Sequence, residues 1–551
     1  MQQQLQSAYE NGVTQIWIFN VGDIKPVEMA STFALALAWD ISSVGRATLG
    51  EFFRAYATRE LSSAVGDEVS QMLLGLDRLL ALRRHEHIEA DTLSVLNYRE
   101  ADSVVHRYVE LQSRAETLFE RMPPQSKAAF FQLVLHPIKA SRIYTELRVT
   151  QARNRLYAVQ RRNTANVLAQ RVLSLFDDDW KLSQQFHNNP WSKDKWNHMM
   201  KQPRYGYVEG LWRAPSRDMI TGLSFVQRHQ DSNRIVGQMG IAVEGHEGIR
   251  PGLINEESDR THPSRGDLVP GLTLPTLSPY DAQGRYFEIF TRGTTSIHWT
   301  AVCSAPWITL TPASGRLLPD DELDQRVEIS VLWSSVPCVL RDTVTIDVRS
   351  DEGDFEQVHL PVYNFQVPPG FNGLIESDGV VSWMPAALSL NEKQKKDYRV
   401  YSFVGRESAG AIGLSSAQMA DPAPLVYQVL LTSDRPAITL TLYFTMVLET
   451  NPEASHSYDV VVNEIEQCGV PLLESPARGD LPVGWGKAVQ DGVWQRRHVF
   501  KGVTSGINQI RYRPRTPGLL LEKIVVDLGG VRPSYLGPPQ SCHLESVVTA
   551  G

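Results

Sequence analysis

The spacing of apolar residues divides the chain into a short N-terminal unit, a helical region and two regions of strands. The first run, residues 16–19 (Ile-Trp-Ile-Phe), is apolar at every position and is followed by polar and charged residues. An apolar run without alternation is typical of a parallel strand covered on both faces. The apolar stretch from Met29 to Trp39 predicts a helix directly afterwards. Residues 1–62 therefore predict a strand–helix unit, with flanking helices, of a TIM-type barrel.

Residues 63–200 repeat their apolar positions with the period of an α-helix. Two stripes carry this pattern: Val69, Met72, Leu73, Leu76 and Leu80, and Val104, Tyr108, Leu111, Ala115, Leu118 and Met122. We expect a helical bundle here, because each stripe must bury one helix face. Pro123 and Pro124 should separate two helices, and Pro137 should kink or interrupt the next, because proline removes an internal hydrogen bond.

The second half of the chain alternates apolar and polar positions, as half-buried strands do. In residues 276–366 this pattern predicts an immunoglobulin-like β-sandwich, and residues 367–551 predict a second, jelly-roll-like sandwich. Residues 201–275 are rich in proline, glycine, aspartate and arginine and predict a linker that wraps over its neighbours, with a strand or two inside. The expected fold class is multidomain α+β.

Composition narrows the class of protein. A chain of 551 residues has room for about three or four domains. Hydrophobic residues at 42% and charged residues at 21% exclude a disordered chain, and no apolar run is long enough to cross a membrane. A net charge of −8 argues against nucleic acid as a partner. The polar N-terminus has no signal-peptide core, so the sequence as written assigns no localisation; an export signal further upstream would make the protein extracellular.

The sequence contains no clear metal-binding motif. His85 and His87 lie close together but have no third ligand nearby, so a solvated loop is the simpler interpretation. The cysteines, Cys303, Cys338, Cys468 and Cys542, are scattered. Cys303 and Cys338 share one predicted sandwich and could pair, although buried free thiols are favoured. Motifs of zinc proteases, serine hydrolases and phosphate-binding loops are absent, so proteolysis, ester hydrolysis and nucleotide chemistry have no support, and we expect no metal site.

The residues after the first apolar run resemble a known family of carbohydrate enzymes. Asn20 to Glu28 reads Asn-Val-Gly-Asp-Ile-Lys-Pro-Val-Glu, similar to Asn-Val-Gly-Asp-Leu-Lys-Pro-x-Glu of glycoside hydrolase family 115, the xylan α-1,2-glucuronidases. Other segments similar to that family follow in the same order: residues 96–101 (Leu-Asn-Tyr-Arg-Glu-Ala), 130–141, 195–200 (Lys-Trp-Asn-His-Met-Met) and 521–539. The resemblance implies the C-terminal portion of a family member, without the N-terminal domain and most of the catalytic barrel.

The resemblance also implies roles for residues near the predicted strand end. An inverting glycosidase uses one carboxylic acid and one carboxylate, about 6.5–9.5 Å apart. Asp23 and Glu28 would form this catalytic pair, Lys25 would bind the uronic carboxylate, and Asn20 would bind a hydroxyl or the attacking water. The alternative is that Asp23 and Glu28 stabilise the helix start and that Lys25 is their salt-bridge partner.

Other residues have both a binding and a packing interpretation. His198 would face the substrate cleft, or the segment around Trp196 would form a packed plug between domains. In the C-terminal region, Trp383, Trp485, Trp494 and Tyr535 could stack on sugar rings, although core packing is the default for large aromatics. The basic residues Arg142, Arg148, Arg153, Arg155, Arg161 and Arg162 predict the solvent side of bundle helices, or a surface for acidic xylan.

The activity that the resemblance implies is removal of α-1,2-linked (4-O-methyl)glucuronic acid from xylan or glucuronoxylan, without a cofactor. A complete barrel takes about 250 residues, far more than residues 1–62, so we expect the isolated chain to be inactive. The alternative is a non-catalytic carbohydrate-binding or scaffold protein derived from that family. A homodimer is a further expectation drawn from the family.

Overall fold

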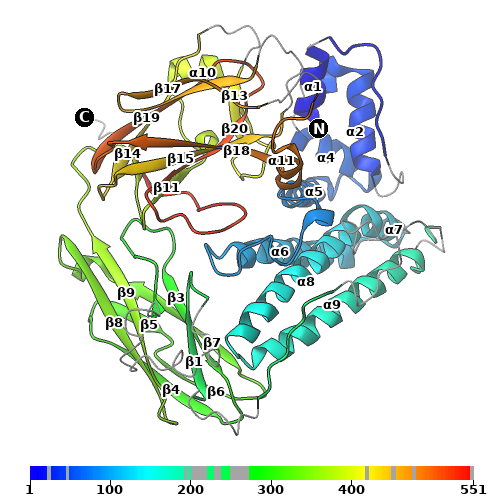
Figure 1. The fold of residues 1–551 in the computed structure, drawn as a ribbon. Helices are drawn as coiled ribbons and strands as arrows, with labels where there is room; N and C mark the ends of the chain where they lie inside the picture. The colour runs from blue at the N-terminus through cyan, green and yellow to red at the C-terminus, as the bar shows by residue number, and fades with distance from the viewer. Residues whose placement is uncertain are drawn as a thin grey trace.

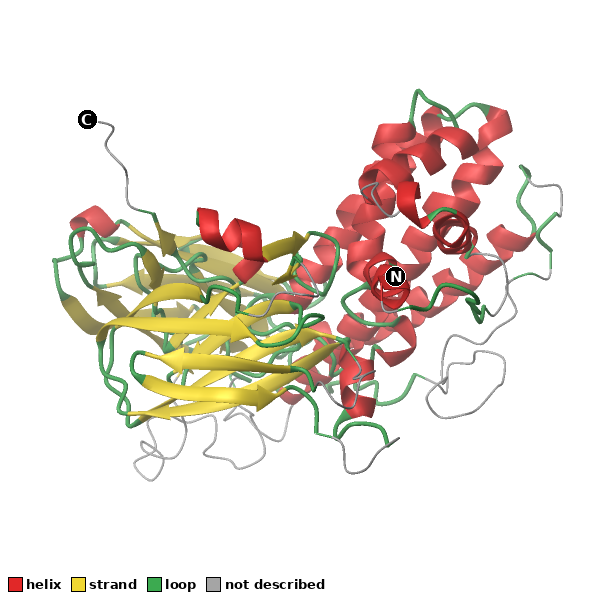
Figure 2. Cartoon of the chain, turned by 90° about the horizontal axis from the view of Figure 1, so that it is seen from above, coloured by secondary structure: helices red, strands yellow, loops and turns green. Residues whose placement is uncertain are grey.

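The computed structural model describes residues 1–10, 12–21, 27–44, 49–191, 195–197, 199, 220–228, 237–247, 272–415, 421–447, 455–474 and 480–545. Helices occupy the first part of the chain, and the remainder forms two separate β regions (Figure 1). Seen from above, the helices stand to one side of the strands (Figure 2). The prediction of a mixed α+β chain with several domains is confirmed.

The helical region buries the predicted apolar stripes. Its helices are α1 (Gln2–Glu10), α2 (Glu28–Trp39), α3 (Ile41–Val44), α4 (Leu49–Glu60), α5 (Gly66–Leu80), α6 (Glu100–Arg121), α7 (Pro124–Phe130), α8 (His136–Val159) and α9 (Thr164–His187). One core contains the stripe residues of α5 and α6, including Met72 and Tyr108, with the exception of Leu80, which is 39% exposed. Pro137 lies in the first turn of α8, directly after a π-helical turn, η2 (Phe131–Leu135), so the helix changes type there instead of ending.

The first β region consists of two sheets that share one core. One sheet has the order β1 (Met239–Val243), β3 (Arg285–Thr291), β7 (Asp324–Val331) and β5 (Ile308–Thr311). The other has the order β2 (Leu272–Thr273), β9 (Phe355–Asn364), β8 (Leu340–Ser350), β4 (Ile297–Cys303) and β6 (Ser314–Leu317). Phe287 and Trp299 come from different sheets and are both fully buried in that core. Alternation along β4 places every second residue inside.

The C-terminal β region has the same two-sheet plan. One sheet has the order β17 (Ile465–Pro471), β16 (Ser457–Val462), β19 (Gly506–Pro514), β14 (Leu425–Leu431), β10 (Gly373–Ile375) and β21 (His543–Leu544). The other has the order β12 (Tyr398–Tyr401), β13 (Ala411–Leu414), β20 (Leu521–Asp527), β15 (Ala437–Thr445) and β18 (Val493–Lys501), with β11 (Val380–Trp383) also on β20. The short helices α10 (Glu392–Asp397) and α11 (Trp485–Asp491) lie beside these sheets.

The predicted barrel strand is not formed. Residues 16–19 are irregular coil, and Ile16 and Ile18 are 74% and 83% exposed. A strand must pair its backbone groups with neighbouring strands, and no strand lies beside this segment in the described residues. Among the described residues, strands pair in parallel only between β2 and β9, between β10 and β14, and at one isolated bridge. The apolar run made residues 16–19 a candidate strand. A strand needs partner strands, and the described residues provide none for this segment.

The cysteines are free thiols. Cys303 and Cys542 are half-buried, whereas Cys338 and Cys468 are exposed. The pairing of Cys303 with Cys338 is therefore wrong for this structure, and so is the expectation that the free thiols are buried. Cys338 lies just before β8 and Cys468 lies on β17 at a sheet edge, and both positions face solvent.

Candidate functional site

The structure describes two of the predicted site residues. Asn20 lies in exposed coil directly after residues 16–19, and Glu28 is the first residue of α2. Asp23, Lys25 and His198 lie outside the described residues. That these five side chains form one site therefore stays a prediction. Glu28 occupies a position where a carboxylate interacts favourably with the positive end of a helix.

Glu28 contacts the π-helical turn of the bundle. The side-chain amide of Gln132, a buried residue of η2, donates a hydrogen bond to the Glu28 carboxylate. Within α2, the Thr32 hydroxyl donates to the Glu28 carbonyl oxygen at 2.7 Å. π-Helical turns are uncommon and often occur at functional sites. This contact fixes the orientation of one carboxylate against the bundle, which sequence reasoning did not find because the two residues are 104 positions apart.

Aromatic rings surround the same turn. His136 packs against Phe131 and Phe186 with ring centroids 5.9 and 4.6 Å away, and Phe186 stacks on Trp196 at 5.7 Å. Trp196 is buried in the core of the helical region, and Met199 packs against that core. The packing interpretation of this segment is therefore right for Trp196, although the cluster belongs to the helical core and not to a boundary between domains.

Two segments singled out by family resemblance bind each other. Asn97 Nδ2 donates to the Pro533 carbonyl at 2.8 Å, and the Arg532 backbone N–H donates to the Tyr98 hydroxyl at 2.9 Å. Glu100, which is 5% exposed, accepts backbone N–H bonds from Ser94, Tyr535 and Leu536 at 2.6, 3.1 and 2.5 Å. We call residues 96–101 together with residues 529–539 the interdomain latch. It fastens the C-terminal β region to the start of α6.

Tyr535 is the centre of the latch. The guanidinium groups of Arg83 and Arg406 lie over its ring, 5.0 and 4.9 Å from the ring centroid. Its hydroxyl oxygen lies 2.8 Å from the carbonyl oxygens of both Leu82 and Asp491, and one of these accepts its single O–H at a time. With two guanidinium groups over its ring and its hydroxyl hydrogen-bonded, Tyr535 is not a free platform for a sugar ring. The stacking interpretation of Tyr535 is wrong for this arrangement.

The tryptophans of the C-terminal region also pack inside. Trp383 is fully buried and Trp494 is 2% exposed, both in the core of that region. Trp485 is partly buried and its ring lies 6.1 Å from that of Trp494. Core packing is therefore confirmed for Trp383 and Trp494, because the interior of a two-sheet region needs large apolar side chains.

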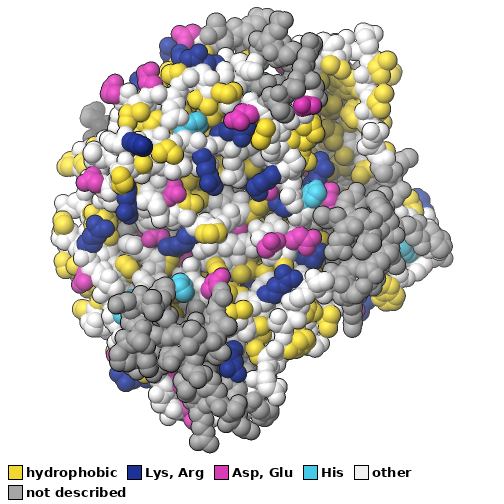
Figure 3. Space-filling model, in the orientation of Figure 1, with side chains coloured by type: hydrophobic (Ala, Val, Ile, Leu, Met, Phe, Trp, Pro, Cys, Tyr) yellow, Lys and Arg dark blue, Asp and Glu magenta, His cyan; other side chains and the backbone are white. Residues whose placement is uncertain are grey.

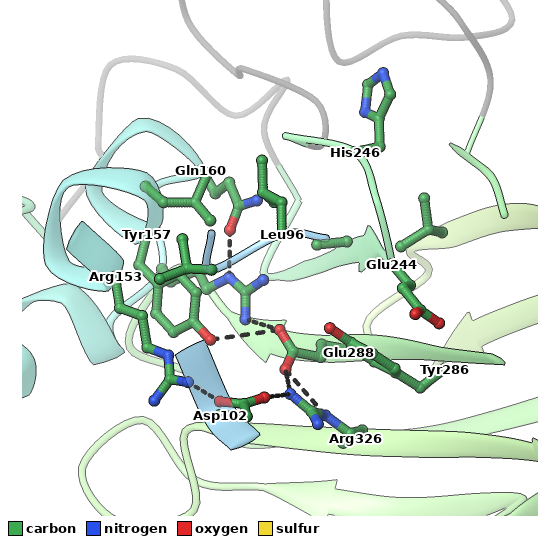
Figure 4. Close-up of a pocket in the computed structure, with 15 residues that line it drawn as sticks. Leu96, Asp102, Arg153, Tyr157, Gln160, Glu244, His246, Tyr286, Glu288 and Arg326 are labelled. Carbon is green, nitrogen blue, oxygen red and sulfur yellow. Dashed lines mark hydrogen bonds and ion pairs between the residues drawn. The ribbon is translucent and has the colours of Figure 1, made fainter. Parts of the chain in front are cut away.

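A small pocket lies where the helical bundle meets the first β region (Figure 4). Arg162 donates to Glu288 at 2.8 Å, and Arg326 bridges Glu288 at 3.0 Å and Asp102 at 3.5 Å. Arg153 also pairs with Asp102. Burial by itself raises the pKa of Glu288, but the two guanidinium groups hold that pKa below its ordinary value. The charged side chains that line the pocket are paired with one another. We therefore interpret this place as a network of ion pairs between the bundle and the first β region.

The network corrects one prediction about the arginine-rich stretch. Arg148 and Arg162 are 5% and 1% exposed, so neither lies on the solvent side of the bundle. The Arg162 guanidinium is 3.8 Å from the centroid of Tyr157 and 4.2 Å from that of Phe290. Arginine tolerates such burial because its planar group stacks on rings while its N–H groups pair with carboxylates.

A buried carboxylate in the C-terminal region provides a pH-dependent prediction. Glu522 on β20 is 1% exposed and accepts the Arg406 backbone N–H at 2.8 Å. Burial raises the pKa of Glu522 to about 7, although the Arg406 guanidinium and N–H act in the opposite direction. The ordinary pKa of this carboxyl group is 4.5. At pH values between 4.5 and about 7, Glu522 is therefore protonated in the folded protein and ionised in the unfolded chain.

We expect the free energy of unfolding to fall as the pH rises through that window, by up to about 3 kcal/mol from this group. Glu522→Gln should remove this part of the pH dependence and stabilise the protein above pH 7. Urea unfolding at about pH 5 and pH 7.5 measures the difference. Glu466→Gln, at an exposed site on β17, is the matched control and should retain the wild-type dependence. An unchanged slope in Glu522→Gln would contradict the prediction.

Neither a cluster of metal ligands nor a membrane-spanning helix occurs in the part of the chain that the structure describes. No three His, Cys, Asp or Glu side chains there are grouped so that they could hold a metal ion. None of the helices in the same residues has the length and apolar character needed to span a bilayer.

Comparison with known proteins places both ends of the chain in one family. The model described as "Glycosyl hydrolase family 115" matches residues 1–87, and the model "Glycosyl hydrolase family 115 C-terminal domain" matches residues 373–540. The sequence matches no curated protein. Residues 529–539 of the interdomain latch lie in the second matched region, residues 96–101 lie between the two, and the Tyr535 hydroxyl reaches the first at the Leu82 carbonyl.

Similar solved structures were also found. One is described as a novel family GH115 4-O-methyl-α-glucuronidase, BtGH115A, with specificity for decorated arabinogalactans. It is 14% identical, with a TM-score of 0.52, over 95% of this chain and 47% of that chain. The present chain thus spans about half the length of this relative, and the likeness shows a shared fold. A CBM35 from Paenibacillus barcinonensis is 14% identical over 26% of this chain and 97% of its own, with a TM-score of 0.17, too low to support an argument.

Proposed function

Because the chain belongs to glycoside hydrolase family 115, we propose that it is the C-terminal part of a glucuronidase acting on xylan. The observation that carries the proposal is the match of both family models, in order, on one chain whose fold follows a family 115 structure over 95% of its length. The complete enzyme would remove α-1,2-linked (4-O-methyl)glucuronic acid. The structurally similar BtGH115A has specificity for decorated arabinogalactans, so a second polysaccharide belongs in any activity test.

The proposed mechanism is inversion by a pair of carboxyl groups. One protonates the leaving oxygen while the other activates a water on the opposite face of the sugar. We assign this pair to Asp23 and Glu28, with Lys25 on the uronic carboxylate and Asn20 on a hydroxyl or the water. His198 would line the cleft. The Gln132 hydrogen bond to Glu28 supports the assignment, because a catalytic carboxylate needs a fixed orientation.

We expect residues 1–551 alone to release no glucuronic acid. Asn20 is exposed in coil, and no neighbouring strand holds residues 16–19 in the described structure, so the chain provides little of the rigid, dry site that hydrolysis requires. The assay incubates the purified chain with glucuronoxylan and with decorated arabinogalactan and measures free (4-O-methyl)glucuronic acid by chromatography. Release that the Glu28→Gln variant abolishes would contradict the expected inactivity and would support the site assignment.

A non-catalytic carbohydrate-binding protein is the second candidate, favoured by a groove on the C-terminal β region. Apolar side chains and amides line it together: Leu388, Leu390, Val426, Gln394 and Gln428. The Gln394 amide is fixed, because it donates to the Pro424 carbonyl at 3.0 Å and accepts the Asn391 N–H at 3.0 Å. Such mixed surfaces suit neutral sugars. Retention on a xylan gel without release, weakened by Gln428→Ala, would favour this candidate.

A further inference from the structure

A polar cavity lies where the helical region and the two β regions meet. Its wall combines Tyr98 of the interdomain latch, Glu244 directly after β1, Arg285 at the start of β3, and residues from 377–380 and 538–541 of the C-terminal β region. We call it the junction cavity. It measures about 80 Å³, counted as the space that the centres of water molecules can occupy, which is room for roughly five to eight waters. The space-filling view shows charged side chains of both signs along the band where these parts of the molecule meet (Figure 3).

Glu244 brings a buried carboxylate to this cavity. Its side chain is 6% exposed, and its Oε2 atom is buried and accepts no hydrogen bond in the described structure. Figure 4 shows Glu244 apart from the ion pairs that join Glu288, Arg326 and Asp102. A buried carboxylate oxygen without a donor costs free energy. A ligand that supplies an O–H or N–H group at this position would therefore be bound favourably.

The other charged groups of the cavity already have partners. Arg285 Nη2 donates to the Thr276 carbonyl at 2.6 Å and pairs with Asp281 at 2.9 Å. Arg532 pairs with Asp378, and the second oxygen of Asp378 accepts the Thr276 N–H at 3.0 Å. These contacts fix the wall of the cavity before any ligand arrives. Such pre-organisation lowers the entropy cost of binding.

Hydroxyl donors remain on the same wall. The Tyr98 hydroxyl accepts the Arg532 N–H at 2.9 Å, and the Ser541 hydroxyl accepts the Ser382 N–H at 2.9 Å. Neither hydroxyl donates to an acceptor among the residues that the structure describes, although each carries one O–H. The cavity therefore presents an acceptor at Glu244 and donors at Tyr98 and Ser541.

This combination suits a neutral polyhydroxyl ligand better than an ion. Burial raises the pKa of Glu244, and the Arg285 guanidinium is near enough to act in the opposite direction, so a bound cation would meet a positive charge. A bound anion would meet Glu244 itself. A sugar hydroxyl both donates and accepts, and Tyr280, Pro538 and Pro539 add apolar surface for the C–H groups of a sugar ring.

We propose that the junction cavity binds one neutral pyranose unit, with Glu244 accepting a hydrogen bond from one sugar hydroxyl and Tyr98 and Ser541 donating to others. The lining residues Ala282 and Gln283 are exposed, so one side of the cavity is at the surface and the remainder of an oligosaccharide would extend there. The choice of D-xylose and D-galactose as test sugars rests on the proposed function, because these are units of xylan and of arabinogalactan.

The test titrates the full chain with each sugar in a calorimeter. We expect saturable binding with one site per chain and a dissociation constant of about 1 mM, corresponding to a weak single-unit ligand. Glu244→Gln should weaken this binding about tenfold or more, because the sugar O–H loses its charged acceptor. The same substitution should not lower the free energy of unfolding, since it removes a buried charge. Ser541→Ala is a second variant and should weaken binding several-fold.

Glu322→Gln is the matched control, because Glu322 is exposed in the first β region away from the cavity, and its affinity should equal that of the wild type. Hydrogen exchange locates the bound sugar: residues 529–541 should exchange more slowly when D-xylose is added to the wild type, and not in Glu244→Gln.

Four results would overturn the proposal. They are no saturable binding of either sugar, equal affinity in the wild type and both cavity variants, loss of binding in Gln428→Ala in place of Glu244→Gln, and binding of calcium chloride or sodium phosphate instead of sugar. The third result would assign the sugar to the groove of the C-terminal β region. None of these measurements depends on release of glucuronic acid, so failure of this site and failure of the proposed function are distinguishable.

Discussion

Replacing Arg162 with alanine should destabilise the protein by about 3–5 kcal/mol, the cost of removing one partner from a buried ion pair. The substitution leaves Glu288 with Arg326 and the Tyr157 hydroxyl as partners and removes the Arg162 cation that lies 3.7 Å from Asp324. It also removes the group packed between the rings of Tyr157 and Phe290. Because these residues join α8 and α9 to β3 and β7, we expect the bundle and the first β region to lose their fixed contact.

Thermal and urea unfolding measure this effect, with hydrogen exchange at β3 as a local readout, because a chain of several domains need not unfold in one step. Arg162→Lys should recover only part of the loss, since an ammonium cannot reproduce the planar stacking. Arg171→Ala is the control: Arg171 pairs with Glu146 at the surface, and its loss should cost no more than about 1 kcal/mol. Equal effects at the two positions would contradict the role assigned to burial.

Replacing Glu100 with alanine should cost about 3–5 kcal/mol, since three backbone N–H groups lose their acceptor at about 1–3 kcal/mol each when buried. The donors are the backbone N–H groups of Ser94, Tyr535 and Leu536. The substitution therefore removes the acceptor that holds the two segments of the interdomain latch together. We expect residues 529–539 to become accessible to protease while the core of the C-terminal β region stays folded.

Limited proteolysis and urea unfolding test this prediction. Glu110→Ala on the same helix is the matched control, because Glu110 is exposed and, among the described residues, pairs with His106 at the surface. This variant should stay within about 0.5 kcal/mol of the wild type. If Glu100→Ala leaves the latch as protected as in the wild type, the carboxylate is not what holds it closed.

Much of the architecture could be predicted from local patterns. The apolar stripes of α5 and α6 and the alternation along the β regions depend on periods of about 3.6 and 2 residues, which the sequence records directly. The same patterns failed at residues 16–19, where the apolar run matched a strand but the structure shows exposed coil. Strand formation depends on partner strands, and the pattern of one segment carries no information about whether they are present.

The candidate site was only partly predictable. The sequence pointed to Asn20 and Glu28 by their position after an apolar run, and the structure adds Gln132, which contacts Glu28 from the bundle. No local signal linked the two, because their contact depends on how α2 packs against the π-helical turn. The same holds for Arg162, which a basic stretch placed at the surface and which tertiary packing buries.

The sequence by itself determined most of the helices and strands and pointed to family 115, which the family models match at both ends of the chain, because periodicity and short motifs are properties of neighbouring residues. Only the tertiary structure decided which motifs meet. Residues 96–101 and 529–539 are separated by more than 400 positions. Hydrogen bonds in which Asn97 donates and Tyr98 and Glu100 accept hold them together. Burial and charge pairing follow from such distant contacts, which no local pattern encodes.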